Sequence, residues 1–122
     1  SYAEVIQGGD GNSSEIIQRE DSPPTENFTA LVDQDGDGNG SLIDQDGNDH
    51  WAEVSQSGDG NLSELFQTGS SHIAFVDQSG DNNQSSLTQS GSGNWASVTQ
   101  MTDNNMSAVT QSGSGNVATV TQ

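Results

Sequence analysis

The sequence predicts an all-β protein: a β-solenoid of stacked β-arches with cross-β strand pairing. Three observations predict it. Glutamine recurs at a nearly constant interval along the whole chain. Between the glutamines, the residue types that recur from copy to copy are spaced by two. A glycine follows almost every glutamine two residues later. A two-residue period is that of a strand, and a fixed repeat along the chain is typical of a solenoid. Eleven half-repeats of 11 residues correspond to about 5.5 repeats of 22, so we expect residues 1–122 to form a single repeat domain.

The glutamine column defines the repeat. Its members are Gln7, Gln18, Gln34, Gln45, Gln56, Gln67, Gln78, Gln89, Gln100, Gln111 and Gln122. Every interval is 11 residues except the one from Gln18 to Gln34, which is 16. The five additional residues fall within 19–26, where two prolines and three acidic residues predict an inserted loop.

An aliphatic column lies two residues before the glutamines. Its members are Val5, Ile16, Val32, Ile43, Val54, Leu65, Val76, Leu87, Val98, Val109 and Val120. Four residues before each glutamine, Ala and Ser alternate without a break, so the full period is 22 residues made of two similar halves. Side chains spaced by two share one face of a strand, and we expect this nearly invariant face to point inward.

An asparagine column lies six residues before most glutamines. Its members are Asn12, Asn39, Asn61, Asn83, Asn94, Asn105 and Asn116. Identical amide side chains stacked on successive rungs form hydrogen-bonded ladders in cross-β structures. We therefore expect the Asn and Gln columns, together with the aliphatic column, to form the core of a stack. His50 and His72 occupy the asparagine position of two copies, and we favour stacked hydrogen-bonding substitutes over a metal-binding pair.

Composition excludes several classes of function. The net charge is −17 with a single Lys or Arg, so the chain lacks the cations that bind nucleic acid or an anionic membrane surface. No apolar run is long enough to insert into a membrane. No Cys is present, and no Ser-His-Asp set can be separated from the repeat, so we expect neither an enzyme nor a cofactor. Because the chain begins at Ser1 without a visible signal peptide, we expect a mature or trimmed secreted form.

Acidic residues recur in one turn. Asp10, Asp37, Asp59, Asp81 and Asp103 each lie three residues after a glutamine of the odd-numbered copies. Such a column predicts repulsion between rungs and faster assembly in salt, divalent cations or mild acid. Weak divalent-cation binding there and a purely solvated acidic edge both stay open. The segment from Asp33 to Asp44 resembles a calcium loop, but strands flank it and a dedicated calcium site is not expected.

Aromatic side chains are expected on the outward face of the odd-numbered strands. Trp51, Phe75 and Trp95 lie there, where they either bind a partner surface or are simply tolerated.

The first and last predicted strands coincide with the two ends of this sequence and show no Pro, Lys or capping element. We therefore expect end-to-end stacking of the chain with copies of itself.

The repeat resembles that of curlin subunits, Ser-x5-Gln-x-Gly-x2-Asn-x-Ala-x3-Gln. The first copy matches at Ser1, Gln7, Gly9, Asn12 and Gln18, although Ser14 stands where the family has Ala. Ser replaces Ala in every even-numbered copy. The resemblance implies an amyloid fibre subunit that is secreted through an outer-membrane export machinery of a Gram-negative bacterium. It also implies assembly at the cell surface, often from a nucleator subunit, for adhesion and biofilm matrix.

Two other functions compete with this interpretation. A monomeric ice-binding solenoid is partly supported by the outward threonines Thr88, Thr99, Thr110 and Thr121, although the earlier copies carry other residues there. A calcium-dependent repeat adhesin would need an Asp in the turn of each half-repeat, whereas the even-numbered copies carry Asn48, Ser70, Ser92 and Ser114. Concentration-dependent fibre formation separates the fibre subunit from both.

Overall fold

The computed structural model describes residues 1–20 and 27–122, which form eleven β-strands and no helix. No described segment is therefore a helix that could span a membrane. The strands are β1 (Tyr2–Gln7), β2 (Ser13–Glu20), β3 (Thr29–Asp35), β4 (Gly40–Asn48), β5 (Trp51–Ser57), β6 (Leu62–Ser70), β7 (Ile73–Ser79), β8 (Gln84–Ser92), β9 (Trp95–Gln100), β10 (Met106–Ser114) and β11 (Val117–Thr121).

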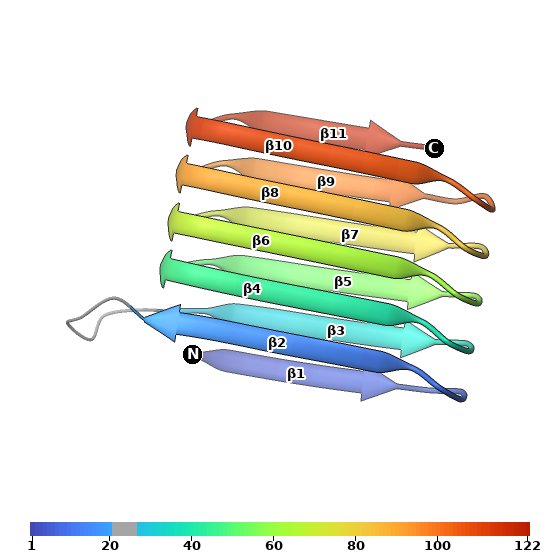
Figure 1. The fold of residues 1–122 in the computed structure, drawn as a ribbon. Coiled ribbons are helices and arrows are strands. Elements are labelled where there is room, and N and C mark those ends of the chain that lie inside the picture. Colours follow the sequence, from blue (N-terminus) through green and yellow to red (C-terminus); the bar gives the residue numbers. More distant parts are fainter. Residues whose placement is uncertain (21–26) are drawn as a thin grey trace.

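Successive strands alternate between two parallel sheets that face each other (Figure 1). Sheet A has the order β1-β3-β5-β7-β9-β11, and sheet B has the order β10-β8-β6-β4-β2. Each strand pairs in register with the equivalent strand one repeat away, so that Ala52 lies beside Ala74 and Gln56 beside Gln78. This arrangement confirms the predicted β-solenoid with a period of 22 residues.

The turns of both half-repeats share one backbone conformation. The second residue after the glutamine has a φ between 85° and 123° wherever it is glycine, and the fourth has a φ between 55° and 71°. Glycine is required at the second position where the next rung lies close, since a Cβ on Gly58 would lie 2.4 Å from the carbonyl oxygen of Gly80. Thr102 takes this position in the turn after β9 and does not adopt a positive φ.

The core lies between the two sheets and is narrow. The aliphatic column supplies its centre, with Ile43, Val54, Leu65, Leu87 and Val98 fully buried. Burial declines at both ends of the stack, where a strand has a neighbour on one side only. Val5 on β1 is 44% exposed, and Ile16 and Val120 are only half-buried. Val5 is exposed in the single chain because no described residue covers the outer side of β1, and its place in the core of a fibre stays a prediction.

The predicted inserted loop begins later than the sequence suggests. Arg19 and Glu20 continue β2 and pair with Asp46 and Gly47 of β4. The Arg19 guanidinium also forms an ion pair with the Asp44 carboxylate on the outer face of sheet B. This pairing holds the two residues in the strand, and the remainder of the predicted loop, 21–26, lies outside the described residues.

Candidate functional site: polar ladders and end faces

The glutamine column forms two continuous ladders, one in each sheet. In each, the Nε2 of one glutamine donates to the Oε1 of the glutamine on the next rung, over distances of 2.6–3.0 Å. Gln34, Gln56 and Gln78 are fully buried within this chain of bonds. All the bonds point the same way, with the donor on the side of β1 and β2. The ladders are therefore directional.

The glutamines from Gln18 to Gln122 also tie the two sheets together. The Nε2 of Gln56 donates to the carbonyl oxygen of Gly40, the first residue of the preceding strand, at 2.9 Å. The equivalent bond is made by ten glutamines, from Gln18 to Gln122, over 2.9–3.2 Å. Among the described residues, Gln7 is the glutamine whose amide makes the ladder bond without a bond across the core.

The asparagine column holds the turns in place. Asn39 and Asn61 each donate a backbone N–H to the Oδ1 of the asparagine one rung earlier, at 2.8 and 2.9 Å. The Nδ2 of Asn39 donates to the carbonyl oxygen of Gly58 in the turn of the following rung, at 2.8 Å. In this ladder the accepting oxygen belongs to the earlier rung, whereas in the glutamine ladders it belongs to the later rung. At the end formed by β10 and β11, the Oδ1 atoms of Asn105 and Asn116 accept no hydrogen bond from the described residues.

His50 and His72 take the place of asparagine with the same hydrogen-bonding pattern. Each Nδ1 accepts a backbone N–H from the next rung, from His72 and from Asn94, at 3.3 and 3.2 Å. Each Nε2 donates to the carbonyl oxygen four residues earlier, of Asp46 and of Thr68, at 3.1 Å. Accepting at Nδ1 requires the neutral Nε2–H tautomer. Because both nitrogens of each ring bind the backbone, no lone pair is left for a metal ion.

The histidine pair is buried in a stack of rings. The rings of His50 and His72 lie 5.1 Å apart and nearly parallel, and Phe28 packs on His50 at 5.6 Å. Burial lowers the pKa of both imidazoles, and the proximity of His72 lowers the pKa of His50 further. The Nε2 bond to Asp46 O, and the Asp49 and Asp46 carboxylates, act in the opposite direction on the His50 pKa.

The turn aspartates form a third ladder, which sequence reasoning missed. Oδ1 of Asp37, Asp59, Asp81 and Asp103 accepts the backbone N–H of the equivalent aspartate one rung earlier, over 2.7–2.9 Å. The recurrence of Asp at one turn position is the sequence signal of this ladder. Among the described residues, no group of three or more His, Asp or Glu side chains could hold a metal ion. Weak divalent-cation binding to this column stays a prediction.

The inner serines of sheet B are an unusual feature of the core. The hydroxyls of Ser41, Ser63, Ser85 and Ser107 are buried and have no hydrogen-bond partner among the described residues. Sheet A carries alanine at the equivalent position, for example Ala52 and Ala74. A buried hydroxyl without a partner costs free energy, so the Ser column weakens the stack relative to an Ala column.

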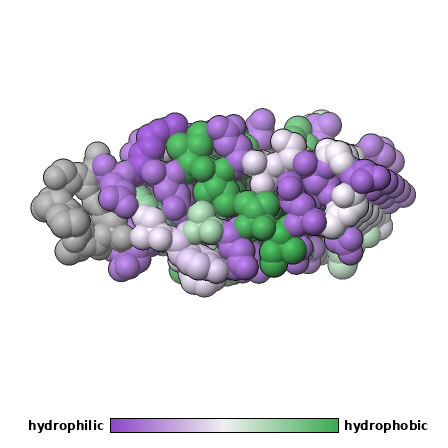
Figure 2. Space-filling model, turned by 90° about the horizontal axis from the view of Figure 1, so that it is seen from below, coloured by the Kyte–Doolittle hydropathy of each residue, from purple (hydrophilic) through white to green (hydrophobic). Residues whose placement is uncertain are grey.

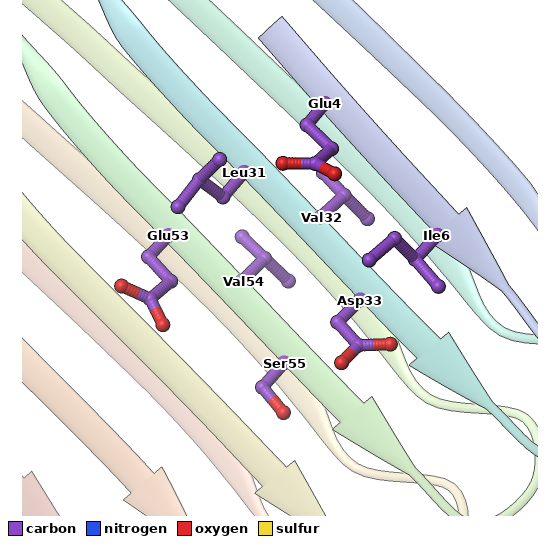
Figure 3. A pocket seen from close by; sticks show the side chains of 8 residues that line it. All are labelled: Glu4, Ile6, Leu31, Val32, Asp33, Glu53, Val54 and Ser55. Atoms are coloured by element: carbon purple, nitrogen blue, oxygen red, sulfur yellow. The ribbon is translucent and has the colours of Figure 1, made fainter.

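The outward face of sheet A carries the predicted aromatic residues. Trp51 and Trp95 both pair with Ile73 and therefore lie in one column along the stack. Phe75, on the same strand as Ile73, packs on Trp95 with ring centroids 6.4 Å apart. Further along the stack, a shallow depression of about 200 Å³ lies over β1, β3 and β5, with the Glu4, Asp33 and Glu53 carboxylates around it (Figure 3). The binding of a partner to this face stays a prediction.

The outward threonines do not form an array along the stack. Thr99 pairs with Thr121 in sheet A, and Thr88 pairs with Thr110 in sheet B. The same columns continue into Asp77 beside Thr99 and into Phe66 beside Thr88. A flat threonine surface therefore covers only one end of the stack.

The end formed by β1 and β2 presents core side chains to solvent. Seen from below, a band of hydrophobic side chains crosses this end between hydrophilic flanks (Figure 2). Val5 and Ile6 are 44% and 55% exposed, and Ile16 is half-buried. At the other end, β10 and β11 each have a paired neighbour on one side only. The end formed by β1 and β2 therefore exposes an apolar centre, and both ends expose the edges of two parallel strands.

Comparison with known proteins agrees with this geometry. No curated protein matches the chain. The family model for the curlin associated repeat matches residues 26–58, 51–80, 58–91, 80–113 and 91–122, which together span most of the sequence. The matched repeats carry the buried Gln and Asn ladders, and the chain belongs to the curlin associated repeat family.

Proposed function

We propose that this chain is the structural subunit of a secreted, curli-type amyloid fibre that assembles by end-to-end stacking of identical copies. The family relationship suggests such a subunit. The observation that carries the proposal is the direction of the ladders, because a directional ladder ends in different groups at its two ends. Stacking of the N-terminal end of one copy on the C-terminal end of another joins these groups.

The two ends carry matching hydrogen-bonding groups. At the end formed by β1 and β2, the Oε1 atoms of Gln7 and Gln18 point along the stack and accept no bond from the described residues. At the opposite end, the amides of Gln111 and Gln122 each use one Nε2 proton on a backbone carbonyl. In the other glutamines, the second proton of the amide makes the ladder bond to the next rung. A donor therefore meets an acceptor only when unlike ends join.

Joining unlike ends gives an open assembly. A head-to-tail interface that does not close into a ring generates a filament, whereas two like ends would give a closed pair. If the β1 and β2 ends of two copies met, the glutamine amide oxygens of one copy would face those of the other. Each added copy presents the same free end again, so growth continues. The paired backbone edges and the covered apolar centre stabilise each junction.

The setting of the fibre is part of the proposal. Family membership supports an extracellular fibre on the surface of a Gram-negative bacterium, exported through an outer-membrane machinery, started by a nucleator subunit and serving adhesion and biofilm matrix. We propose a structural rather than a catalytic role, since the buried glutamine side chains bond to one another along the stack. The net charge of −17 per copy keeps the separate chains soluble before assembly.

Imaging of the freshly desalted chain at neutral pH, together with thioflavin fluorescence, tests the proposal. We expect unbranched fibres after a lag, and we expect sheared fibres added as seeds to shorten that lag. Seeds that have been dissolved in denaturant and diluted are the matched control and should leave the lag unchanged. A folded monomer that persists at high concentration would contradict the proposal.

A further inference from the structure

We infer that, in fibres formed by residues 1–122, neighbouring copies are related by a half-turn about the fibre axis, so that β1 of one copy pairs with β10 of the copy below and β2 pairs with β11. This inference rests on the proposed end-to-end assembly. It names the partner of each terminal strand, and it differs from a stack in which all copies face the same way.

The two halves of the repeat are structurally interchangeable. Both halves place the same inward sequence of Asn or its substitute, Ala or Ser, an aliphatic residue and Gln on the core. Both turns adopt the same positive φ values at the second and fourth residues after the glutamine. A half-turn about the stack axis therefore superposes a sheet A strand on a sheet B strand with its direction and inner side chains preserved.

The coil has one defined strand position that comes next after β11. Strands alternate between the sheets, and β11 lies in sheet A above β9. The position that follows β11 in the coil lies in sheet B, directly above β10 (Figure 1). After a half-turn, β1 of the next copy occupies this position and runs parallel to β10. Its β2 then lies above β11, and the coil continues through the junction.

Without the half-turn, one strand position stays empty at every junction. β1 of the next copy would pair with β11, because both then belong to sheet A. Its β2 would lie two strand spacings above β10, since one sheet ends a half-rung higher than the other. The backbone edge of β10, which is the last strand of sheet B, would stay unpaired at this gap. The half-turn pairs both edges, whereas the unrotated stack pairs only one.

Among the described residues, Gln7 lacks the hydrogen bond across the core that the other glutamines make. Ten glutamines donate from Nε2 to the first residue of the strand preceding them in the coil, as Gln122 does to Met106 at 3.1 Å. Gln7 has no preceding strand among the described residues and makes only its ladder bond. In the rotated stack, β11 of the copy below precedes β1. The carbonyl oxygen of Val117 in that copy then becomes the acceptor for Gln7, and all eleven glutamines are equivalent.

The half-turn has a consequence for the fibre surface. The column that contains Trp51, Ile73 and Trp95 belongs to sheet A of each copy. Rotation by a half-turn places this column on opposite sides of the fibre in successive copies. Each side of the fibre therefore alternates between the outer face of sheet A and that of sheet B.

Cysteine cross-linking distinguishes the two stacks, since the chain has no cysteine of its own. Ile6, Thr110 and Thr121 each lie one residue before a glutamine and face outward. The rotated stack places Ile6 of one copy beside Thr110 of its neighbour, and the unrotated stack places it beside Thr121. Residues directly paired on adjacent strands are close enough for a disulfide. Fibres would be grown from equal mixtures of two single-cysteine chains, oxidised, dissolved and analysed without reductant.

We expect a disulfide-linked dimer from I6C mixed with T110C, and none from I6C mixed with T121C or from I6C alone. A dimer from I6C with T121C, or fibres with neither dimer, would overturn the half-turn while leaving the fibre itself established. An absence of fibres from the unsubstituted chain would overturn the proposed function as well.

Electron microscopy of fibres of the unsubstituted chain gives a second, independent measurement. In the rotated stack each copy advances the fibre by 5.5 strand spacings, about 26 Å, and turns it by about half a revolution. In the unrotated stack the advance is six spacings, about 29 Å, with only the small twist of a β-stack. An advance near the larger value would overturn the inference.

Discussion

The backbone N–H of His72 donates to Nδ1 of His50, 3.3 Å away, while the two imidazole rings stack 5.1 Å apart inside the solenoid. This bond exists only while His50 is neutral, because a protonated Nδ1 cannot accept. The stack thus contains two buried groups that can be protonated, in a column whose other members are amides that do not titrate.

We predict that acid destabilises the stack through this pair. Burial lowers the histidine pKa values in the folded state, so the unfolded chain binds more protons as the pH falls. The stabilising contribution is complete above the unfolded pKa of about 6.5 and is lost as the pH falls toward the folded value. The soluble concentration in equilibrium with fibres should therefore rise between pH 7.5 and 5.

The matched control for the acid effect is the double substitution His50→Asn and His72→Asn. Asparagine is the residue of this column elsewhere, and it makes the same two kinds of hydrogen bond. We expect the pH dependence of the variant's soluble concentration to be clearly shallower over the same range. An unchanged pH dependence would contradict the assignment of the acid effect to the histidine pair.

The turn aspartates should act in two opposing ways, which substitution of Asp59 can separate. Its Oδ1 accepts the backbone N–H of Asp37 at 2.8 Å, and its charge lies in a column of like charges. Asp59→Asn keeps an acceptor and removes the charge, so fibre growth in low salt should become faster and less dependent on salt. Asp59→Ala removes the acceptor as well and should raise the soluble concentration several-fold, an effect of about 1 kcal/mol. Equal growth rates of both variants and the original chain would contradict this account.

The inner serines should be replaceable with a gain in stability. The hydroxyl of Ser63 is fully buried without a partner among the described residues. Ser63→Ala is therefore expected to stabilise the fibre by about 1 kcal/mol, which lowers the equilibrium soluble concentration roughly five-fold. The reciprocal substitution Ala52→Ser, at the equivalent position of sheet A, should destabilise it by a similar amount. Destabilisation by Ser63→Ala would mean that the hydroxyl has a hydrogen-bond partner in solution.

Two turn glycines should respond very differently to alanine. Gly58 has a φ of 103°, and an added Cβ would lie 2.4 Å from the Gly80 carbonyl oxygen on the next rung. Gly58→Ala should therefore abolish or strongly slow assembly. Gly93 has a φ of 63° with no atom within 4 Å of an added Cβ. Gly93→Ala should cost only about 1 kcal/mol, the usual penalty of a left-handed residue with a Cβ. The lag times of seeded assembly measure the effects of the two substitutions. Similar lag times for Gly58→Ala and Gly93→Ala would argue against close stacking of the turns.

Much of the fold could be predicted because the interactions that define it repeat along the sequence. A two-residue period marks the inner face, and a 22-residue period marks the stacking partner, so columns such as Val32, Val54 and Val76 follow from counting alone. Turn positions followed for the same reason, since Gly58 and its equivalents recur at one place after the glutamine. The family resemblance rested on this same pattern and is confirmed by the matched repeats.

The sequence by itself determined which side chains face inward, since the alternation of a strand is local and each column repeats its residue type. Only the tertiary structure decided the direction of the glutamine ladders, the use of both His50 nitrogens on the backbone, and the bond from Asp37 N–H to Asp59. Tertiary pairing also placed Arg19 and Glu20 in β2 and left Val5 exposed. These features depend on the atoms one rung away, and neither the direction of a hydrogen bond nor the absence of a neighbour at an edge is encoded in a local period.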